Sequence, residues 1–163
     1  MTYLPKTLLS IAKAGASKLA TAADPRCRYD RCIFLLGHMR CGSTALSGIL
    51  CARPEISGYG ETHIAYDSAA ALGLLSLNLR KYESQKPGAD WFFDKVLHNA
   101  YDALPAARYF ESRAIFLVRE PEVSIRSIRN LFAKIGSEEY ASDAAAADYY
   151  ADRIDRLTAM WHR

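Results

Sequence analysis

A short apolar strand followed by a glycine-rich loop and a helix is the feature that most constrains this chain. Residues 33–36 form an apolar run that suits a buried strand and is too short for a helix. Gly37 ends the run, and the apolar residues after residue 44 follow the spacing of one helical face. This order directs backbone N–H groups and the positive end of a helix dipole at an anion. The sequence therefore predicts an anion-binding turn, although an ordinary strand-to-helix turn uses the same residue types.

The loop matches the phosphate-binding pattern G-x-x-x-x-G-K-[ST] only in part. Gly37, Gly42 and Thr44 fit the pattern, whereas Ser43 stands where the lysine is expected. That lysine reaches the β- and γ-phosphates of a nucleoside triphosphate, so a loop without it suits a shorter anion. Arg40 supplies a planar guanidinium from a different place in the loop.

The remaining sequence alternates strands with helices. We expect further strands at residues 91–96 and 114–118, and helices at about 64–82, 98–110, 120–135 and 137–163. Pro121 suits the first turn of its helix, and Ser137 is a candidate cap for the last helix. The alternation predicts a three-layer α/β/α fold with a parallel sheet and ligands at the carboxyl ends of the strands. Arg40, Lys95 and Arg119 each lie at or just beyond such an end.

Composition indicates one globular domain that binds small anions. The chain has 163 residues, 50% of them hydrophobic and 24% charged, and a net charge of +3, which is too small to indicate nucleic acid. Four cysteines without a C-x-x-C pair favour a reduced, cytoplasmic setting, and four histidines without a metal-binding spacing predict no metal site. No run of about 18 apolar residues predicts a membrane span.

Residues 1–29 form a basic amphipathic segment and a linker, ahead of a main domain at residues 30–163. Such a segment most often packs on its own domain or on a partner. A membrane-surface helix and a transit-peptide-like role are the alternatives that the sequence leaves open.

The segment Arg40-Cys41-Gly42-Ser43-Thr44 resembles the R-[SG]-G-[ST]-[ST] loop of PAPS-dependent sulfotransferases, with Cys41 in place of the more usual serine. Similar family features follow at residues 53–56, at Gly60-Glu61-Thr62 and at the R-x-P-x-x-x-x-x-S segment of residues 119–127. The motifs are most similar to the tyrosylprotein and bacterial branch. The resemblance implies a P-loop NTPase-like sheet.

The resemblance also implies 3′-phosphoadenosine 5′-phosphosulfate (PAPS) as the sulfuryl donor and a hydroxyl acceptor, whether small molecule, carbohydrate or protein tyrosine. The implied nucleotide-binding residues are Arg40, Cys41, Gly42, Ser43 and Thr44 for the 5′-phosphate, and Arg119 and Ser127 for the 3′-phosphate.

The implied catalytic residues are Lys95, which would neutralise the leaving phosphate, and Glu61, which would act as base. His98 is the second choice for the base, because it lies three positions after the lysine and the small-molecule enzymes of the family place their histidine two positions after it. His38 and His63 flank the loop, where each is either a local hydrogen-bonding residue or a contact to the sulfonate or acceptor.

The resemblance covers about residues 30–135, and family members usually continue well beyond this point. We therefore expect the apolar face of the last helix, including Tyr150, Ile154, Leu157 and Trp161, to lack a partner and to favour self-association as a homo-oligomer. A fragment, a truncated product and a minimal member completed by dimerisation remain open. The rival functions are a small P-loop nucleotide-binding protein or kinase and a degenerate, non-catalytic sulfotransferase-like binding module.

Overall fold

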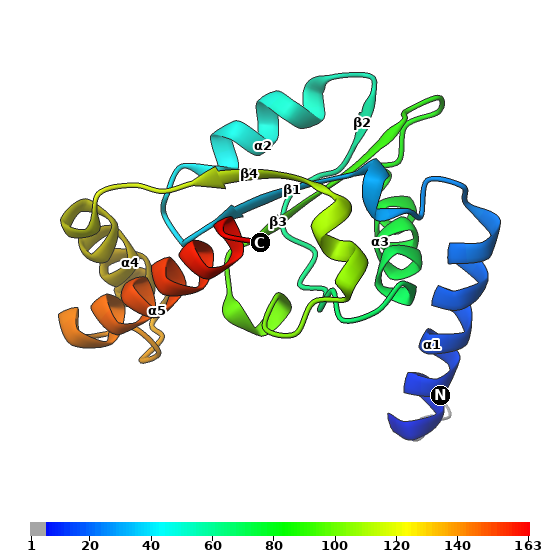
Figure 1. The fold of residues 1–163 in the computed structure, drawn as a ribbon. Coiled ribbons are helices and arrows are strands. Elements are labelled where there is room, and N and C mark those ends of the chain that lie inside the picture. Colours follow the sequence, from blue (N-terminus) through cyan, green and yellow to red (C-terminus); the bar gives the residue numbers. More distant parts are fainter. Residues whose placement is uncertain (1–5) are drawn as a thin grey trace.

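The computed structural model describes residues 6–163, with side chains from residue 12 onward. Its centre is one all-parallel sheet with the strand order β2-β3-β1-β4 (Figure 1). The strands are β1 (Cys32–Gly37), β2 (Ile56–Ser57), β3 (Trp91–Val96) and β4 (Arg113–Leu117). The expected α/β fold with a parallel sheet is confirmed. The two-residue strand β2 was not expected, because its residues were assigned to a helix exit.

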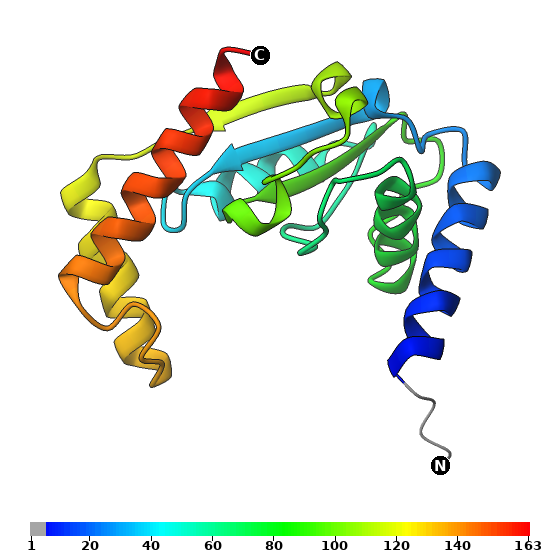
Figure 2. The ribbon, with the colours of Figure 1, turned by 60° about the horizontal axis from the view of Figure 1, so that its bottom comes forward.

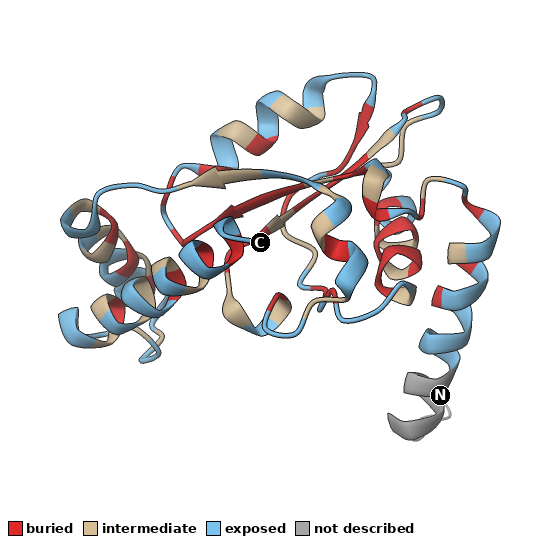
Figure 3. Cartoon of the chain, viewed as in Figure 1, coloured by how far each residue is buried: buried red, intermediate tan, exposed pale blue. Residues whose placement is uncertain are grey.

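Helices cover both faces of the sheet because the strand side chains alternate between two apolar clusters. Phe34 faces the cluster shared with α3 (Ala70–Lys81) and α5 (Asp143–Trp161). Leu35 faces the opposite cluster, which is shared with α2 (Ser43–Ala52). Figure 3 shows the consequence, since β1 and β3 are largely buried between the layers.

The amphipathic N-terminal segment forms α1 (Lys6–Ala23) and lies against α3 (Figure 2). The two helices approach so closely that a Cβ atom on Gly73 would collide with the Ser17 carbonyl oxygen. The Ser17 hydroxyl also donates to the Ala70 carbonyl at the start of α3. The segment therefore packs on its own chain.

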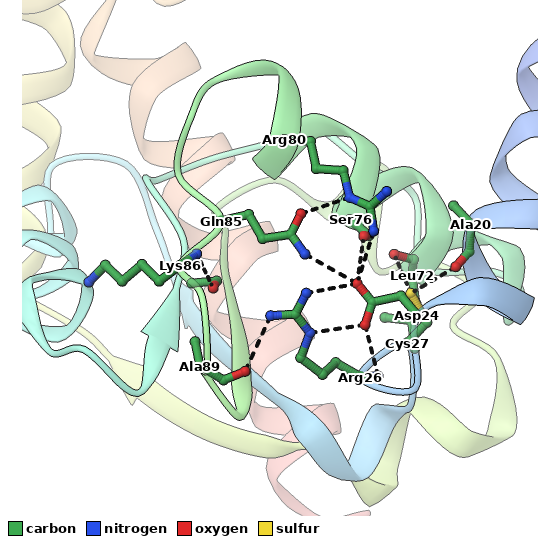
Figure 4. A network of polar contacts seen from close by, with 11 residues as sticks. Ala20, Asp24, Arg26, Cys27, Leu72, Ser76, Arg80, Gln85, Lys86 and Ala89 are labelled. Carbon is green, nitrogen blue, oxygen red and sulfur yellow. Dashed lines mark hydrogen bonds and ion pairs between the residues drawn. The ribbon is translucent and has the colours of Figure 1, made fainter.

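Asp24, at the end of α1, connects α1, α3 and the loop before β3 (Figure 4). Its carboxylate accepts hydrogen bonds from Arg26 Nε at 2.9 Å, Ser76 Oγ at 3.1 Å and Gln85 Nε2 at 3.3 Å. Burial alone would raise the pKa of Asp24, but the side-chain and backbone bonds from Arg26 outweigh it and lower the pKa to about 2. The linker after α1 is therefore anchored by a buried carboxylate.

The helix expected to begin near residue 64 instead begins at Ala70, so that prediction is wrong for its first turns. The preceding segment is irregular, with His63 at φ 56°, and is held by long-range bonds. Thr62 N and Tyr66 Oη donate to the Asp94 carboxylate at 3.0 and 2.6 Å, and Tyr66 N donates to the Tyr101 carbonyl. These contacts fix the backbone in a form that a helix does not allow.

The helix expected at residues 98–110 is also wrong. Two short 3₁₀ helices, Asn99–Tyr101 and Ala107–Glu111, take its place. Pro105 lies between them, and its ring removes an N–H donor and disfavours a helical conformation at the preceding residue.

The last two helices lie side by side beyond β4. The first, α4 (Pro121–Ile135), begins with proline as predicted. The second begins at Asp143 and not near residue 137, because Ser142 caps it by accepting a hydrogen bond from Ala145 N at 3.1 Å. Ser137 is not the cap.

The apolar face of α5 packs against the sheet, which corrects the expectation of an unpartnered face. Leu157 is buried and Ile154 packs on the same cluster. The Tyr150 hydroxyl donates to a carbonyl after β4, and the exposed Trp161 packs edge-on against Phe116 with ring centroids 5.1 Å apart. The apolar face therefore gives no argument for self-association.

Candidate active site

The carboxyl ends of β1, β3 and β4 open into a cleft of about 610 Å³, which we call the first cleft. β1 lies between β3 and β4, so the order of the strands in the sheet reverses beside it. Parallel sheets usually bind ligands at the carboxyl ends of the strands at such a reversal. Most of the predicted site residues line it, namely Arg40, Gly42, Ser43, Thr44, Glu61, Lys95, His98 and Arg119. Cys41 and Ser127 do not line it.

The loop after β1 presents unpaired backbone donors at the start of α2. Arg40 and Gly42 adopt left-handed conformations, with φ of 65° and 95°. Within residues 6–163, the N–H groups of Gly42, Ser43 and Thr44 have no hydrogen-bond acceptor. Three free donors at a helix N-terminus form a typical anion site.

Cys41 lies beneath this loop and is buried. Its sulfur lies 3.0 Å from the position of a Cβ atom on Gly37, and the Leu117 carbonyl lies 2.8 Å from that position. The ends of β1 and β4 therefore approach so closely that only glycine fits. The Cys41 side chain contributes packing beneath the loop.

Two predicted anion subsites lie next to each other. Arg40 Nε donates to Ser127 Oγ at 2.9 Å, and Arg119 Nη1 donates to the Arg40 carbonyl at 3.3 Å. Ser127 is on α4, which follows the end of β4. These three residues therefore lie together although they are far apart in sequence.

His38 and Tyr150 hold the backbone of Arg119. His38 Nε2 accepts from Arg119 N at 3.0 Å, and its Nδ1 donates to the Met39 carbonyl at 2.8 Å. Burial lowers the pKa of His38, which agrees with the neutral tautomer that these bonds require. Tyr150 Oη donates to the Arg119 carbonyl at 2.8 Å. His38 is thus a local hydrogen-bonding residue, one of its two predicted roles.

The two candidate bases are neighbours. His98 Nε2 lies 4.0 Å from Glu61 Oε1, and His63 Nε2 lies 3.9 Å from the same atom. That oxygen is buried and has no hydrogen-bond partner among the described residues. Burial lowers the pKa of His98, although the Glu61 carboxylate opposes this shift, so the imidazole is neutral at pH 7. Neutral His98 can therefore accept a proton there.

Asp94, which the sequence analysis did not single out, anchors this side of the first cleft. Its buried carboxylate accepts from Thr62 N, Thr62 Oγ, Tyr66 Oη and Lys95 N at 2.5–3.0 Å. Burial outweighs these bonds and raises the pKa of Asp94 to about 7. The Asp94 side chain thus holds both Thr62, the residue after Glu61, and the backbone of Lys95. An acidic residue at a core-facing position of an apolar strand is the signal that identifies it.

Arg153 on α5 is a second residue that the sequence analysis missed. Its fully buried guanidinium donates to the Gly37 carbonyl at 2.8 Å and to the Val96 carbonyl at 2.9 Å, at the ends of β1 and β3. It also pairs with Asp102 at 2.9 Å. Arg153 therefore fixes the two strand ends that carry the loop and Lys95.

Comparison of the chain with protein-family models, curated proteins and solved structures gives no match. Among residues 6–163, no three or more His, Cys, Asp or Glu side chains are grouped so that they could hold a metal ion. No helix in that part of the chain combines the length and apolar character needed to cross a membrane.

Proposed function

We propose that this chain is a PAPS-dependent sulfotransferase domain with a P-loop-like anion site, which transfers a sulfuryl group to a hydroxyl acceptor. The observation that supports this most is the composition of the first cleft. Free N–H donors at the start of α2, three cationic side chains (Arg40, Lys95 and Arg119) and the Glu61–His98 carboxylate–imidazole pair all line this cleft. Groups suited to anion binding and to proton removal thus line one cleft, which supports the proposal.

The nucleotide would bind through the loop and the arginines. The free N–H groups of residues 42–44 and the Thr44 hydroxyl would hold the 5′-phosphate. Arg119 and Ser127 would hold the 3′-phosphate, with Arg40 between the two subsites. The backbone bonds to His38 and Tyr150 support this role, because they fix the point from which the Arg119 side chain extends.

The transfer would proceed in line. The acceptor oxygen forms a bond to sulfur while the bond from sulfur to the bridging phosphate oxygen breaks, which leaves 3′-phosphoadenosine 5′-phosphate (PAP). Lys95 would stabilise the charge that develops on the leaving phosphate, and Glu61 would take the acceptor proton. Neutral His98, 4.0 Å from Glu61, is the alternative base.

The rival function, a kinase or other nucleoside triphosphate-binding protein, requires a lysine in the loop and a carboxylate available for Mg²⁺. Ser43 occupies the lysine position. Asp94 at the end of β3 is the acid nearest to the expected place, but it accepts four hydrogen bonds and does not line the first cleft. We therefore favour the sulfotransferase function.

Thermal unfolding with PAP, PAPS, ATP–Mg²⁺ and GTP–Mg²⁺ tests this proposal. A ligand at about 100 times its Kd adds roughly 2.7 kcal/mol, which raises the Tm by about 5 °C or more in a domain of this size. We expect such shifts with PAP and PAPS and clearly smaller ones with ATP and GTP. Arg126→Ala, at an exposed position outside the first cleft, should leave them unchanged. A shift with ATP–Mg²⁺ and none with PAP would favour the kinase.

A further inference from the structure

A second cleft of about 620 Å³ adjoins the first and shares His98 with it. Its volume lies in the range of small-molecule sites. It is formed by the segment around His63, the first 3₁₀ helix after β3, the loop before α5 and one face of α5.

One wall of the second cleft is a continuous row of aromatic rings. Centroids lie 5.4 Å apart for His63 and Tyr101, 6.2 Å for Tyr101 and His98, 5.6 Å for His98 and Tyr149, and 5.3 Å for Tyr149 and Tyr140. Tyr149 is fixed in place, because its hydroxyl donates to a backbone carbonyl after β3 at 2.8 Å and accepts from a loop N–H at 2.7 Å. Tyr149, in the middle of the row with His98, is therefore held in position by the chain itself.

Acidic side chains also line the second cleft. Glu139, Asp148 and Asp152 line the second cleft, and none has an ion-pair partner among the described residues. A cleft lined by both carboxylates and tyrosine rings suits a cation, because the ring faces and the carboxylates both attract positive charge.

The buried oxygen of Glu61 points to where a ligand's hydroxyl group would bind. Among the residues that the structure describes, Glu61 Oε1 has no hydrogen-bond donor, and it lies 3.9 and 4.0 Å from Nε2 of His63 and His98, which line the second cleft. An unpaired buried acceptor costs free energy that an incoming hydroxyl donor would recover.

We propose that the second cleft binds the acceptor, and that the acceptor is a small hydroxylated amine. The hydroxyl lies at Glu61 and His98, and the protonated amine lies between the tyrosine rings and the carboxylates of Glu139, Asp148 and Asp152. This substrate class rests on the sulfotransferase function proposed above.

Calorimetric titration with three phenols that differ mainly in charge tests the proposal. They are tyramine (positive), 4-ethylphenol (neutral) and 4-hydroxyphenylacetate (negative), each with and without saturating PAP. Tyramine should bind at least about fivefold tighter than 4-ethylphenol, and 4-hydroxyphenylacetate should bind weakest. Higher salt should reduce the preference for tyramine.

The double variant Asp148→Asn/Asp152→Asn should lose most of the tyramine preference and bind 4-ethylphenol within about twofold of the unmutated chain. Asp155→Asn, an exposed position on the same helix outside the second cleft, is the matched control and should bind like the unmutated chain. Equal affinities for the three phenols, or an unchanged preference in the double variant, would overturn the proposal. PAP binding without tyramine preference would refute the acceptor class alone, and tyramine preference without PAP binding would refute the sulfotransferase function alone.

Discussion

Replacing Arg153 by methionine should destabilise the fold by about 2–3.5 kcal/mol. The change leaves Asp102 as a buried charge, which typically costs about 3–5 kcal/mol, and leaves two strand-end carbonyls without donors at about 1–3 kcal/mol each. Burial of the methionine side chain returns about 1.5–3 kcal/mol. We use the lower end of the costs because Arg156, 3.5 Å from Asp102, keeps part of the ion pair.

Urea unfolding followed by tryptophan fluorescence measures this loss. The double variant Arg153→Met/Asp102→Asn should be more stable than the sum of the single changes predicts, by about 1 kcal/mol or more, because the unpaired charge is gone. The matched control Arg126→Met, in an exposed ion pair with N···O of 4.0 Å, should cost less than about 0.5 kcal/mol. A loss below about 1 kcal/mol for Arg153→Met, or strictly additive changes, would refute the role assigned to the buried arginine.

Three further predictions follow from the site and the fold. Glu61→Gln should lower turnover by about 10²–10⁴ with PAP affinity little changed, and a fully active Glu61→Gln beside an inactive His98→Ala would reverse the choice of base. The pKa of Asp94 is raised to about 7 in the folded chain, so between about pH 4 and 7 the folded chain holds a proton that the unfolded chain has lost. The free energy of unfolding should therefore decrease as the pH rises from about 4 to 7, by at most about 1.4 kcal/mol per pH unit. Chemical denaturation across this range should show a smaller slope for Asp94→Asn, and equal slopes would contradict the burial argument. Gly73→Ala should cost about 1–3 kcal/mol in the same assay, because its methyl group would collide with the Ser17 carbonyl, and a neutral effect would argue against the close packing of α1 on α3.

The local parts of the fold could be predicted from sequence because their signals are short-range. The apolar run before Gly37 predicted β1, and Pro121 marked the start of α4, the helix that follows β4. The position of Arg119 beyond a strand end followed from strand periodicity, so the three cationic residues were expected at one edge of the sheet.

The remaining parts depend on long-range contacts that leave no periodic signal. Asp94 on β3 accepts hydrogen bonds from Thr62 and Tyr66 and holds this segment in a non-helical form, so the helical spacing there was misleading. Arg153 lies in an ordinary helix pattern of charged residues, and only the tertiary structure places it beneath the strand ends. The second cleft likewise combines segments that the sequence separates widely.

Calorimetric binding of PAP and 5′-AMP to the unmutated chain and to Arg119→Ala tests the central claim most directly, because the two ligands differ only in the 3′-phosphate. We expect PAP to bind more tightly by about 1.5–3 kcal/mol, roughly a 10- to 150-fold difference in Kd, and Arg119→Ala to remove most of this difference. Arg126→Ala, on the exposed side of α4, should preserve it. Equal affinities of the unmutated chain for PAP and 5′-AMP would contradict the assignment of a 3′-phosphate site and, with it, the use of PAPS.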